Sequence, residues 1–127
     1  WSWSRGLEMC IRDRINVLER LEQDGYILCC ATNSVRHSAT IQLTRRGFID
    51  HLEFVFTNQD VVNPKPNTEI YLRCMIKAGV SPKETIILED SEIGRKGANE
   101  TGAKVLEIED SADVTYRKIR KFIENVK

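Results

Sequence analysis

The stretch at residues 86–91 constrains the fold of this chain more than any other part of its sequence. Three apolar residues at 86–88 run directly into Glu89 and Asp90, and glycines recur through residues 94–102. A short apolar run that ends in polar residues is typical of a strand buried in a parallel sheet. In open parallel sheets, ligands bind beyond the carboxyl ends of the strands. The pattern therefore predicts that Glu89 and Asp90 lie at a binding edge of the sheet.

A second candidate for chemistry is Lys65, which lies between Pro64 and Pro66. Each proline fixes its own φ and holds the preceding residue in an extended conformation, so a rigid backbone presents the lysine. A rigidly held ammonium group suits a phosphate. Two alternatives stay open at this point. Lys65 could be a solvated loop lysine, and the adjacent acids could merely favour the positive amino-terminal end of the following helix.

Strand-like and helix-like patterns alternate along the rest of the chain. Strands that alternate with helices imply right-handed crossovers in a parallel sheet, and therefore an α/β fold. Glycines are expected just past the helix ends, as at Gly25 and Gly79, because glycine tolerates the left-handed cap conformation. We expect strands at 26–31, 52–56, 85–88 and 104–108, and helices at 15–23, 35–46, 67–78, 92–101 and 114–126.

The helix expected at residues 67–78 has a predicted buried face. Apolar residues at helical spacing normally form one stripe that packs against the core. The stripe predicted here consists of Ile70, Leu72, Met75 and Ile76.

Composition narrows the class of protein. The chain has 127 residues, 41% of them hydrophobic, which suffices for the core of one domain. Its 19 basic and 19 acidic residues cancel, so neither nucleic acid nor an anionic membrane is an expected partner. No apolar run approaches the roughly 20 residues of a membrane span, and no signal pattern opens the chain. These features predict a cytoplasmic protein.

The cysteines are expected to be structural. Their positions form neither a Cys-x-x-Cys pair nor the spacing of a zinc site. Buried cysteines that stay reduced behave as small hydrophobic residues. The four cysteines are Cys10, Cys29, Cys30 and Cys74.

Taken in order, the motifs resemble the second half of a phosphohydrolase of the haloacid dehalogenase superfamily, in its β-phosphoglucomutase and phosphoglycolate-phosphatase-like group. The resemblance covers roughly residues 15–110 and rests on several motifs with family-like gaps between them. Residues 1–14 fall outside it, and we expect a non-family, truncated or chimeric start there, although an ordinary helix beginning fits the same residues. The matching motifs are Thr32 and Asn33, Lys65 and Pro66, residues 69–71, 79–82 and 88–94, and the glycine-alanine pairs at 97–98 and 102–103.

The resemblance implies a Rossmann-like three-layer αβα core and phosphoryl transfer through an aspartyl-phosphate. The implied cofactor is Mg²⁺ and the implied partner is a small phosphorylated metabolite. Thr32 and Asn33 are expected to bind phosphoryl oxygens, and Lys65 to balance their charge. Asp90 is expected to ligate Mg²⁺ with help from Glu89, because hard oxygen ligands suit that ion. Taken alone, the polar residues at 32–34 would read as a helix N-cap instead.

The sequence departs from the family at its first motif. An Asp-x-Asp there supplies the nucleophile, and none occurs in this chain; Asp13 alone, outside any strand-like sequence, does not replace it. The helical cap that selects substrate is missing too. We therefore expect the carboxyl-terminal part of such an enzyme, inactive by itself. The alternative is a short non-catalytic α/β protein that binds phosphate, metal or a partner.

The absent first strand has a structural consequence. In the resembled fold it lies between the strands that end near Thr32 and Glu89, so its removal leaves a gap of roughly 10 Å. Either those two strands close up and pair directly, or their open edges leave the chain marginally stable and recruit a strand from another molecule. Residues 1–14 are not expected to fill the gap, because residues 7–23 have helical spacing.

Overall fold

A computed structural model describes residues 11–109 and 114–126. The predicted alternation of helices and strands is confirmed there. Residues 1–10 of the expected non-family start lie outside those ranges, residues 11–14 lie in a helix, and the expectation itself stays a prediction. Within them, no helix has both the length and the apolar character needed to span a bilayer. The helices are α1 (Ile11–Gln23), α2 (Arg36–Arg45), α3 (Glu69–Ala78), α4 (Glu92–Asn99) and α5 (Tyr116–Val126), with 3-10 turns at Ile49–His51, Asn58–Asp60 and Pro82–Glu84. The strands are β1 (Cys29–Ala31), β2 (Phe54–Phe56), β3 (Ile86–Glu89) and β4 (Lys104–Glu107).

β1, β2 and β4 are shorter than their predicted ranges, and β3 has the predicted length but begins and ends one residue later. Tyr26 and Ile27, at the start of the first run, are 38% and 52% exposed and precede β1. The chain leaves α1 through Gly25, whose φ is +93°, and crosses the surface before it reaches the sheet. Glu89, which was expected just after the strand at 85–88, is instead the last residue of β3.

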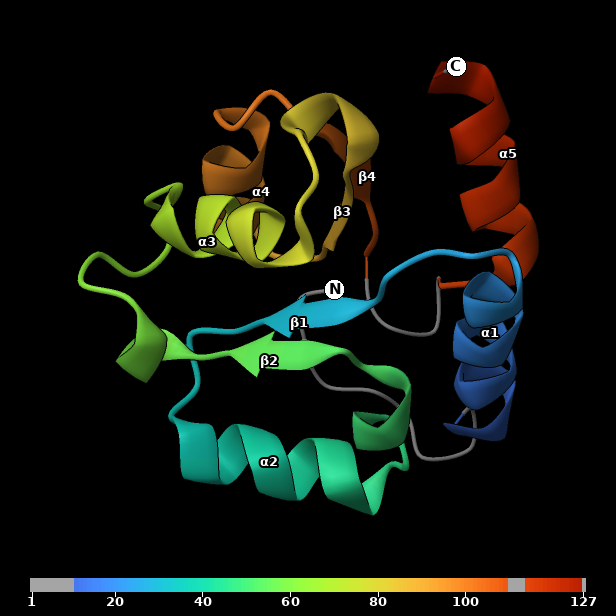
Figure 1. Cartoon of the computed structure of the whole chain (residues 1–127), viewed down its shortest axis with the longest axis horizontal. Coiled ribbons are helices and arrows are strands. Elements are labelled where there is room, and N and C mark those ends of the chain that lie inside the picture. The colour runs from blue at the N-terminus through green and yellow to red at the C-terminus, as the bar shows by residue number, and fades with distance from the viewer. Residues whose placement is uncertain (1–10, 110–113, 127) are drawn as a thin grey trace.

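The strands form two separate parallel pairs. β1 pairs with β2 in the register Cys29 to Phe54, and β3 pairs with β4 in the register Ile86 to Lys104. Figure 1 shows α2 on one side of the β1–β2 pair and α3, β3 and β4 on the other. Across residues 11–109 and 114–126, β1 does not pair with β3. Of the two predicted outcomes, the one in which these strands close up and pair is therefore wrong, and the one in which open edges recruit a strand stays a prediction.

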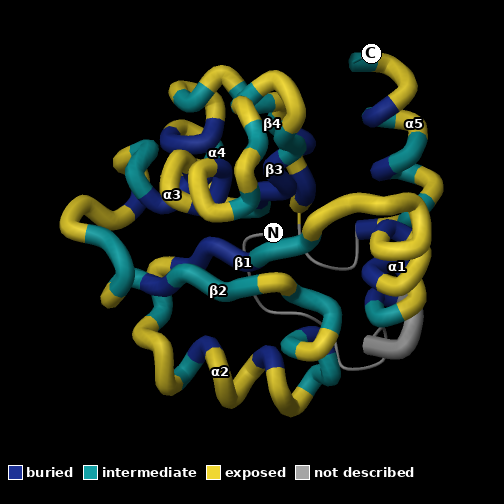
Figure 2. The backbone as a smooth tube through the Cα atoms, in the orientation of Figure 1, coloured by how far each residue is buried: buried dark blue, intermediate teal, exposed yellow. Residues whose placement is uncertain are grey.

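The core is built where helices cover the two strand pairs. α1 and α5 contact each other and pack on Leu88 and Leu106, while α3 packs on Ala31 and Ile87. Since Ile87 and Leu88 are neighbours in β3, they point to opposite faces of that strand. Helices therefore cover both faces, as in a three-layer α/β core. Figure 2 shows buried positions concentrated on β3 and exposed ones along the outer face of α2.

The predicted stripe of α3 is only half right. Ile70 and Met75 are buried as expected, but Leu72 is 38% and Ile76 78% exposed. Tyr71 and Cys74 take their places on the buried face. Both sets have helical spacing, so the pattern alone does not fix the rotation of the helix. Contacts of α3 with β1 and with Glu89 fix it in the folded chain.

Candidate active site

Lys65 joins the carboxyl ends of two strands. Its Nζ donates to the carbonyl oxygen of Ala31, at 3.0 Å, and to Oε2 of Glu89, at 3.1 Å. The Lys65 side chain is 4% exposed and the Glu89 side chain 0%. A buried charge needs a partner and hydrogen bonds, and this pair meets both needs. The alternative of a solvated loop lysine is therefore wrong.

Lys65 lies in the loop at residues 61–68, the lysine loop, which is hydrogen-bonded to the end of β1. The backbone N–H of Lys65 donates to Oδ1 of Asn33 at 3.2 Å, and the Lys65–Pro66 peptide bond is cis. Lys65 Nζ also lies 5.2 Å from the ring centroid of Tyr71, within the range of cation–π attraction. The structure thus brings Lys65, Asn33 and Glu89 together, and their roles toward phosphate and metal stay predictions.

Thr32 lies at the same edge of the sheet. It is buried, its N–H donates to Phe56 O at 3.0 Å, and its Oγ1 accepts from the N–H of Ser34 at 3.1 Å. Asn33, by contrast, is exposed. The N-cap of α2 is Val35, without a side-chain cap bond. The alternative in which residues 32–34 serve as a helix N-cap is therefore wrong.

Tyr71 and Ser91 complete the environment of Glu89. The Tyr71 hydroxyl donates to Glu89 Oε2 at 2.6 Å, and the hydroxyl and N–H of Ser91 donate to Oε1 at 3.1 and 3.4 Å. Burial, together with the hydrogen bond to the carboxylate, raises the pKa of Tyr71. Both carboxylate oxygens of Glu89 are engaged, so this side chain orients Lys65.

Sequence reasoning missed Tyr71, although it belongs to a matched motif. Its hydroxyl lies 3.1 Å from Gly94 O as well as 2.6 Å from Glu89 Oε2, which links α3 to α4 and β3. A tyrosine inside an apolar helical stripe reads as an ordinary core residue. Its spacing gives no signal that a carboxylate lies opposite.

Two glycines of α4 allow the site to close. A Cβ added to Gly94 would lie 2.2 Å from Cδ of Glu89, and one added to Gly97 would lie 2.6 Å from the carbonyl oxygen of Pro66. Either distance is shorter than non-bonded atoms tolerate. α4 can therefore pack this closely against the carboxylate and the lysine loop only because glycine has no side chain at these two positions. The recurring glycines were visible in the sequence, but what they contact was not.

Asp90 is the carboxylate that remains available for a cation. It is partly exposed, and within the described residues its side chain makes no hydrogen bond or ion pair; only its carbonyl oxygen accepts, from Arg95 Nη1 at 3.1 Å. No group of three or more His, Cys, Asp or Glu residues within 11–109 and 114–126 could hold a metal. Mg²⁺ commonly binds through one or two carboxylates, waters and substrate phosphates. Asp90 fits that pattern, and the predicted ligand roles of Asp90 and Glu89 both stay predictions.

The amino-terminal end of α4 opens beside these carboxylates. Ser91 is its N-cap and accepts from the N–H of Gly94 at 3.0 Å.

The family of haloacid dehalogenase-like hydrolases matches residues 9–108. The chain belongs to this family. The predicted family is thereby confirmed.

Relatives and solved structures agree with this membership. A relative from Lacticaseibacillus casei, named "Uncharacterized protein in fgs 3'region", is 30% identical over 81% of this chain and 47% of its own length. The "Phosphorylated carbohydrates phosphatase" of Thermotoga maritima is 28% identical over 67% of this chain and 39% of its own length. The match thus spans less than half of each relative.

The structural comparison includes a phosphomutase. The β-phosphoglucomutase of Clostridium difficile superposes on 89% of this chain and 56% of its own chain, with a TM-score of 0.75 and 17% identity. At that identity the likeness shows the fold alone. It supports the predicted Rossmann-like α/β core.

Glu69 holds the start of the lysine loop, outside the buried cluster. Its carboxylate accepts from the N–H groups of Val62 and Asn63, at 2.9 and 3.1 Å, and from Nε of Arg73 at 2.8 Å. The hydrogen bond from Val62, helped by those from Arg73 and Asn63, lowers the pKa of Glu69 to about 2. The folded form therefore prefers the ionised carboxylate.

This preference predicts a pH-dependent stability. Because the pKa is about 2 when folded and 4.5 as the reference value, the stabilisation is complete above pH 4.5 and is lost as pH falls toward 2. The Glu69→Gln variant should lack this dependence. Urea unfolding of both proteins should show the advantage of the wild type shrinking between pH 4.5 and 2. Glu53→Gln, at an exposed position, is the control. If wild type and Glu69→Gln differed in stability by the same amount from pH 4.5 to pH 2, the lowered pKa of Glu69 would be contradicted.

Proposed function

We propose that this chain supplies the phosphate-binding part of a Mg²⁺-dependent phosphohydrolase or phosphomutase, which acts on a small phosphorylated metabolite through an aspartyl-phosphate. The observation that carries the proposal is the buried Lys65 ammonium group, fixed between Ala31 O and Glu89 Oε2 where two strands end. A preorganised cation stabilises phosphoryl charge without reorganisation during the reaction.

Each residue of the site has a proposed role. The hydroxyl of Thr32 and the amide of Asn33 bind phosphoryl oxygens, and Lys65 balances their negative charge. Asp90 holds Mg²⁺, which neutralises phosphate charge when bound. Glu89 and Tyr71 keep Lys65 in place through their hydrogen bonds. The name of the Thermotoga maritima relative, a phosphorylated carbohydrates phosphatase, supports the proposed class of substrate.

The nucleophile is the part that this sequence does not contain. An aspartyl-phosphate needs an aspartate aimed at the phosphoryl group, and no Asp-x-Asp occurs among the 127 residues. We therefore propose that the chain binds phosphate but does not turn over a phosphate ester by itself.

Phosphate binding tests the proposed site directly. In an NMR titration with inorganic phosphate, we expect shifts at residues 32–34 and 65. Thr32→Val should bind phosphate at least about tenfold more weakly, because one hydrogen bond to a charged group contributes about 1.5–3 kcal/mol. Thr40→Val, at an exposed position of α2, is the matched control. Release of phosphate from sugar phosphates or an aryl phosphate should stay at background.

Two results would count against the proposal. Equal phosphate affinity in Thr32→Val and Thr40→Val would show that phosphate does not bind at the end of β1. Turnover that depends on Lys65 and Asp90 would show that the chain contains a nucleophile of its own.

A further inference from the structure

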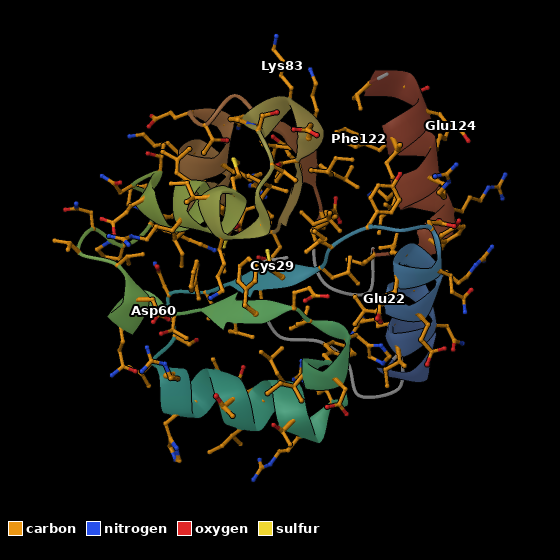
Figure 3. All side chains as sticks on the ribbon, in the orientation of Figure 1. Glu22, Cys29, Asp60, Lys83, Phe122 and Glu124 are labelled. Atoms are coloured by element: carbon orange, nitrogen blue, oxygen red, sulfur yellow. The ribbon has the colours of Figure 1, made fainter. Side chains whose placement is uncertain are left out.

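Two cysteines from different elements lie in contact next to the candidate active site. Cys29 is the first residue of β1, where Figure 3 labels it, and Cys74 lies in α3. The Cys74 thiol donates a hydrogen bond to the sulfur of Cys29. Both side chains belong to the apolar cluster that packs α3 on β1. Both are reduced thiols in this structure, and two sulfur atoms in contact need little movement to form a disulfide.

The neighbouring cysteine of β1 does not share this contact. Adjacent residues of a strand point to opposite faces. Cys30 packs with Leu18 of α1 and Leu43 of α2, in a separate apolar cluster. The fold therefore selects Cys29, from two adjacent cysteines, as the partner of Cys74.

The two thiols in contact differ in their chemistry. The hydrogen bond from Cys74 outweighs burial and lowers the pKa of Cys29 to about 7. The same hydrogen bond, together with burial, raises the pKa of Cys74. Cys29 is half-buried, whereas Cys74 is buried. A partly accessible thiolate beside a protonated thiol is the arrangement of an oxidation-sensitive cysteine and its resolving partner.

We propose that Cys29 and Cys74 are a redox-sensitive pair, which a peroxide converts into a disulfide between β1 and α3. In the first step, the Cys29 thiolate attacks one peroxide oxygen. An S–O bond forms and the O–O bond breaks, and the departing hydroxide takes up the proton that Cys29 released, which gives one water. The product is a sulfenic acid on Cys29.

The second step forms the disulfide. The sulfur of Cys74 attacks the sulfenic sulfur of Cys29, so that the S–S bond forms and the S–O bond breaks. The hydroxyl group leaves with the proton of Cys74 as a second water. Both sulfur atoms are thereby oxidised and both peroxide oxygens are reduced.

The disulfide would join the two elements that hold Lys65. Tyr71, whose ring lies 5.2 Å from Lys65 Nζ, precedes Cys74 by one turn of α3. Ala31, whose carbonyl oxygen accepts from Lys65, lies two residues after Cys29 on the same face of β1. The link also closes a loop of the chain, which stabilises the folded state. The oxidised protein should therefore unfold at a higher urea concentration than the reduced protein.

Treatment of the folded 127-residue chain with hydrogen peroxide tests the pair. After the remaining thiols are blocked with iodoacetamide, trypsin places Cys29 in the peptide at residues 21–36 and Cys74 in the peptide at residues 74–77. Mass spectrometry should find these two peptides joined, and a dithiol reductant should separate them. Circular dichroism before and after oxidation checks that the fold is kept.

Matched alanine variants separate Cys29 from Cys30, which lies on the same tryptic peptide. Cys29→Ala should lower the yield of linked peptides at least about tenfold, because a Cys30 side chain that points away from α3 cannot be bridged to Cys74 without backbone movement. Cys30→Ala is the control and should keep the linkage. Oxidation should raise the urea midpoint of Cys30→Ala and leave that of Cys29→Ala unchanged.

Four results would overturn the proposal. Equal yields of linked peptides from folded Cys29→Ala and Cys30→Ala would show that the observed contact does not direct the bond. Addition of oxygen to Cys29 without linkage would show that Cys74 does not resolve the sulfenic acid. A disulfide-linked dimer on a non-reducing gel, in place of the internal link, would show that the bond joins two chains. Unchanged thiols would show that Cys29 does not react with a peroxide.

Discussion

Replacing Lys65 with methionine is expected to lower the free energy of unfolding by about 3–5 kcal/mol, because the change leaves a buried carboxylate without its cation. Glu89 is 0% exposed and would lose the ammonium group while it keeps the donors of Tyr71 and Ser91. Methionine fills nearly the same space as the lysine stem, so lost packing contributes little. Urea denaturation followed by circular dichroism measures the change.

A double-mutant cycle separates the ion pair from other effects of the substitution. Glu89→Gln should also destabilise, since it leaves the ammonium group buried without a counter-charge, and Lys65→Met with Glu89→Gln should recover much of the loss. The exposed pair Arg120 and Glu124, whose charged atoms lie 3.9 Å apart, is the control and should couple by about 0.3–0.5 kcal/mol. A coupling energy for Lys65 and Glu89 no larger than that of the control would contradict the buried pair.

Replacing Gly97 with alanine is expected to destabilise the protein by about 1–3 kcal/mol, although the same change in an open helix stabilises by roughly 0.5–1 kcal/mol. Whether the alanine lowers or raises the free energy of unfolding therefore tests the close packing at Gly97. The new Cβ would lie 2.6 Å from Pro66 O and 3.1 Å from Asn67 O, and these are backbone atoms that no rotamer change can move. Either α4 or the lysine loop must shift.

This shift is also expected to disturb the proposed phosphate-binding site around Lys65. Pro66 follows Lys65 directly, so displacement of its carbonyl should also weaken phosphate binding in the titration described above. Lys96→Ala, one residue away on an exposed position of α4, is the control and should leave stability within about 0.5 kcal/mol. A stabilised Gly97→Ala protein would show that the close approach of α4 to Pro66 is wrong.

The order of elements and the site residues on strand ends could be predicted because their signals are local. The apolar run before Glu89 predicts a buried strand from neighbouring residues alone, and Gly79, with φ of +75° at the end of α3, marks a helix end through its own backbone. Lys65 and Thr32 were assigned from their motifs and their place in the chain. The structure puts Lys65 against both strand ends, and their roles toward phosphate stay predictions.

The contacts of the site could not be predicted, because each depends on how separate elements pack. The choice of Tyr71 over Leu72 for the buried face of α3 follows from the carboxylate of Glu89, 18 positions away in the chain. Within α4, the glycine pattern was visible, but the atoms opposite Gly94 and Gly97 belong to β3 and to the lysine loop. Periodicity describes one element and contains no information about its neighbour.

By itself, then, the sequence determined an α/β alternation, a family, and a lysine and two acids placed at strand ends, since hydrophobic periodicity, proline and glycine act within a few residues. Only the tertiary structure decided that Lys65, Tyr71 and Ser91 engage both carboxylate oxygens of Glu89, whereas within the described residues the side chain of Asp90 makes no hydrogen bond or ion pair. It also decided that β1 and β3 stay apart across an apolar groove. The physical reason is that helices pack on both faces of the groove through side chains distant in sequence and thereby hold the two strand pairs in place.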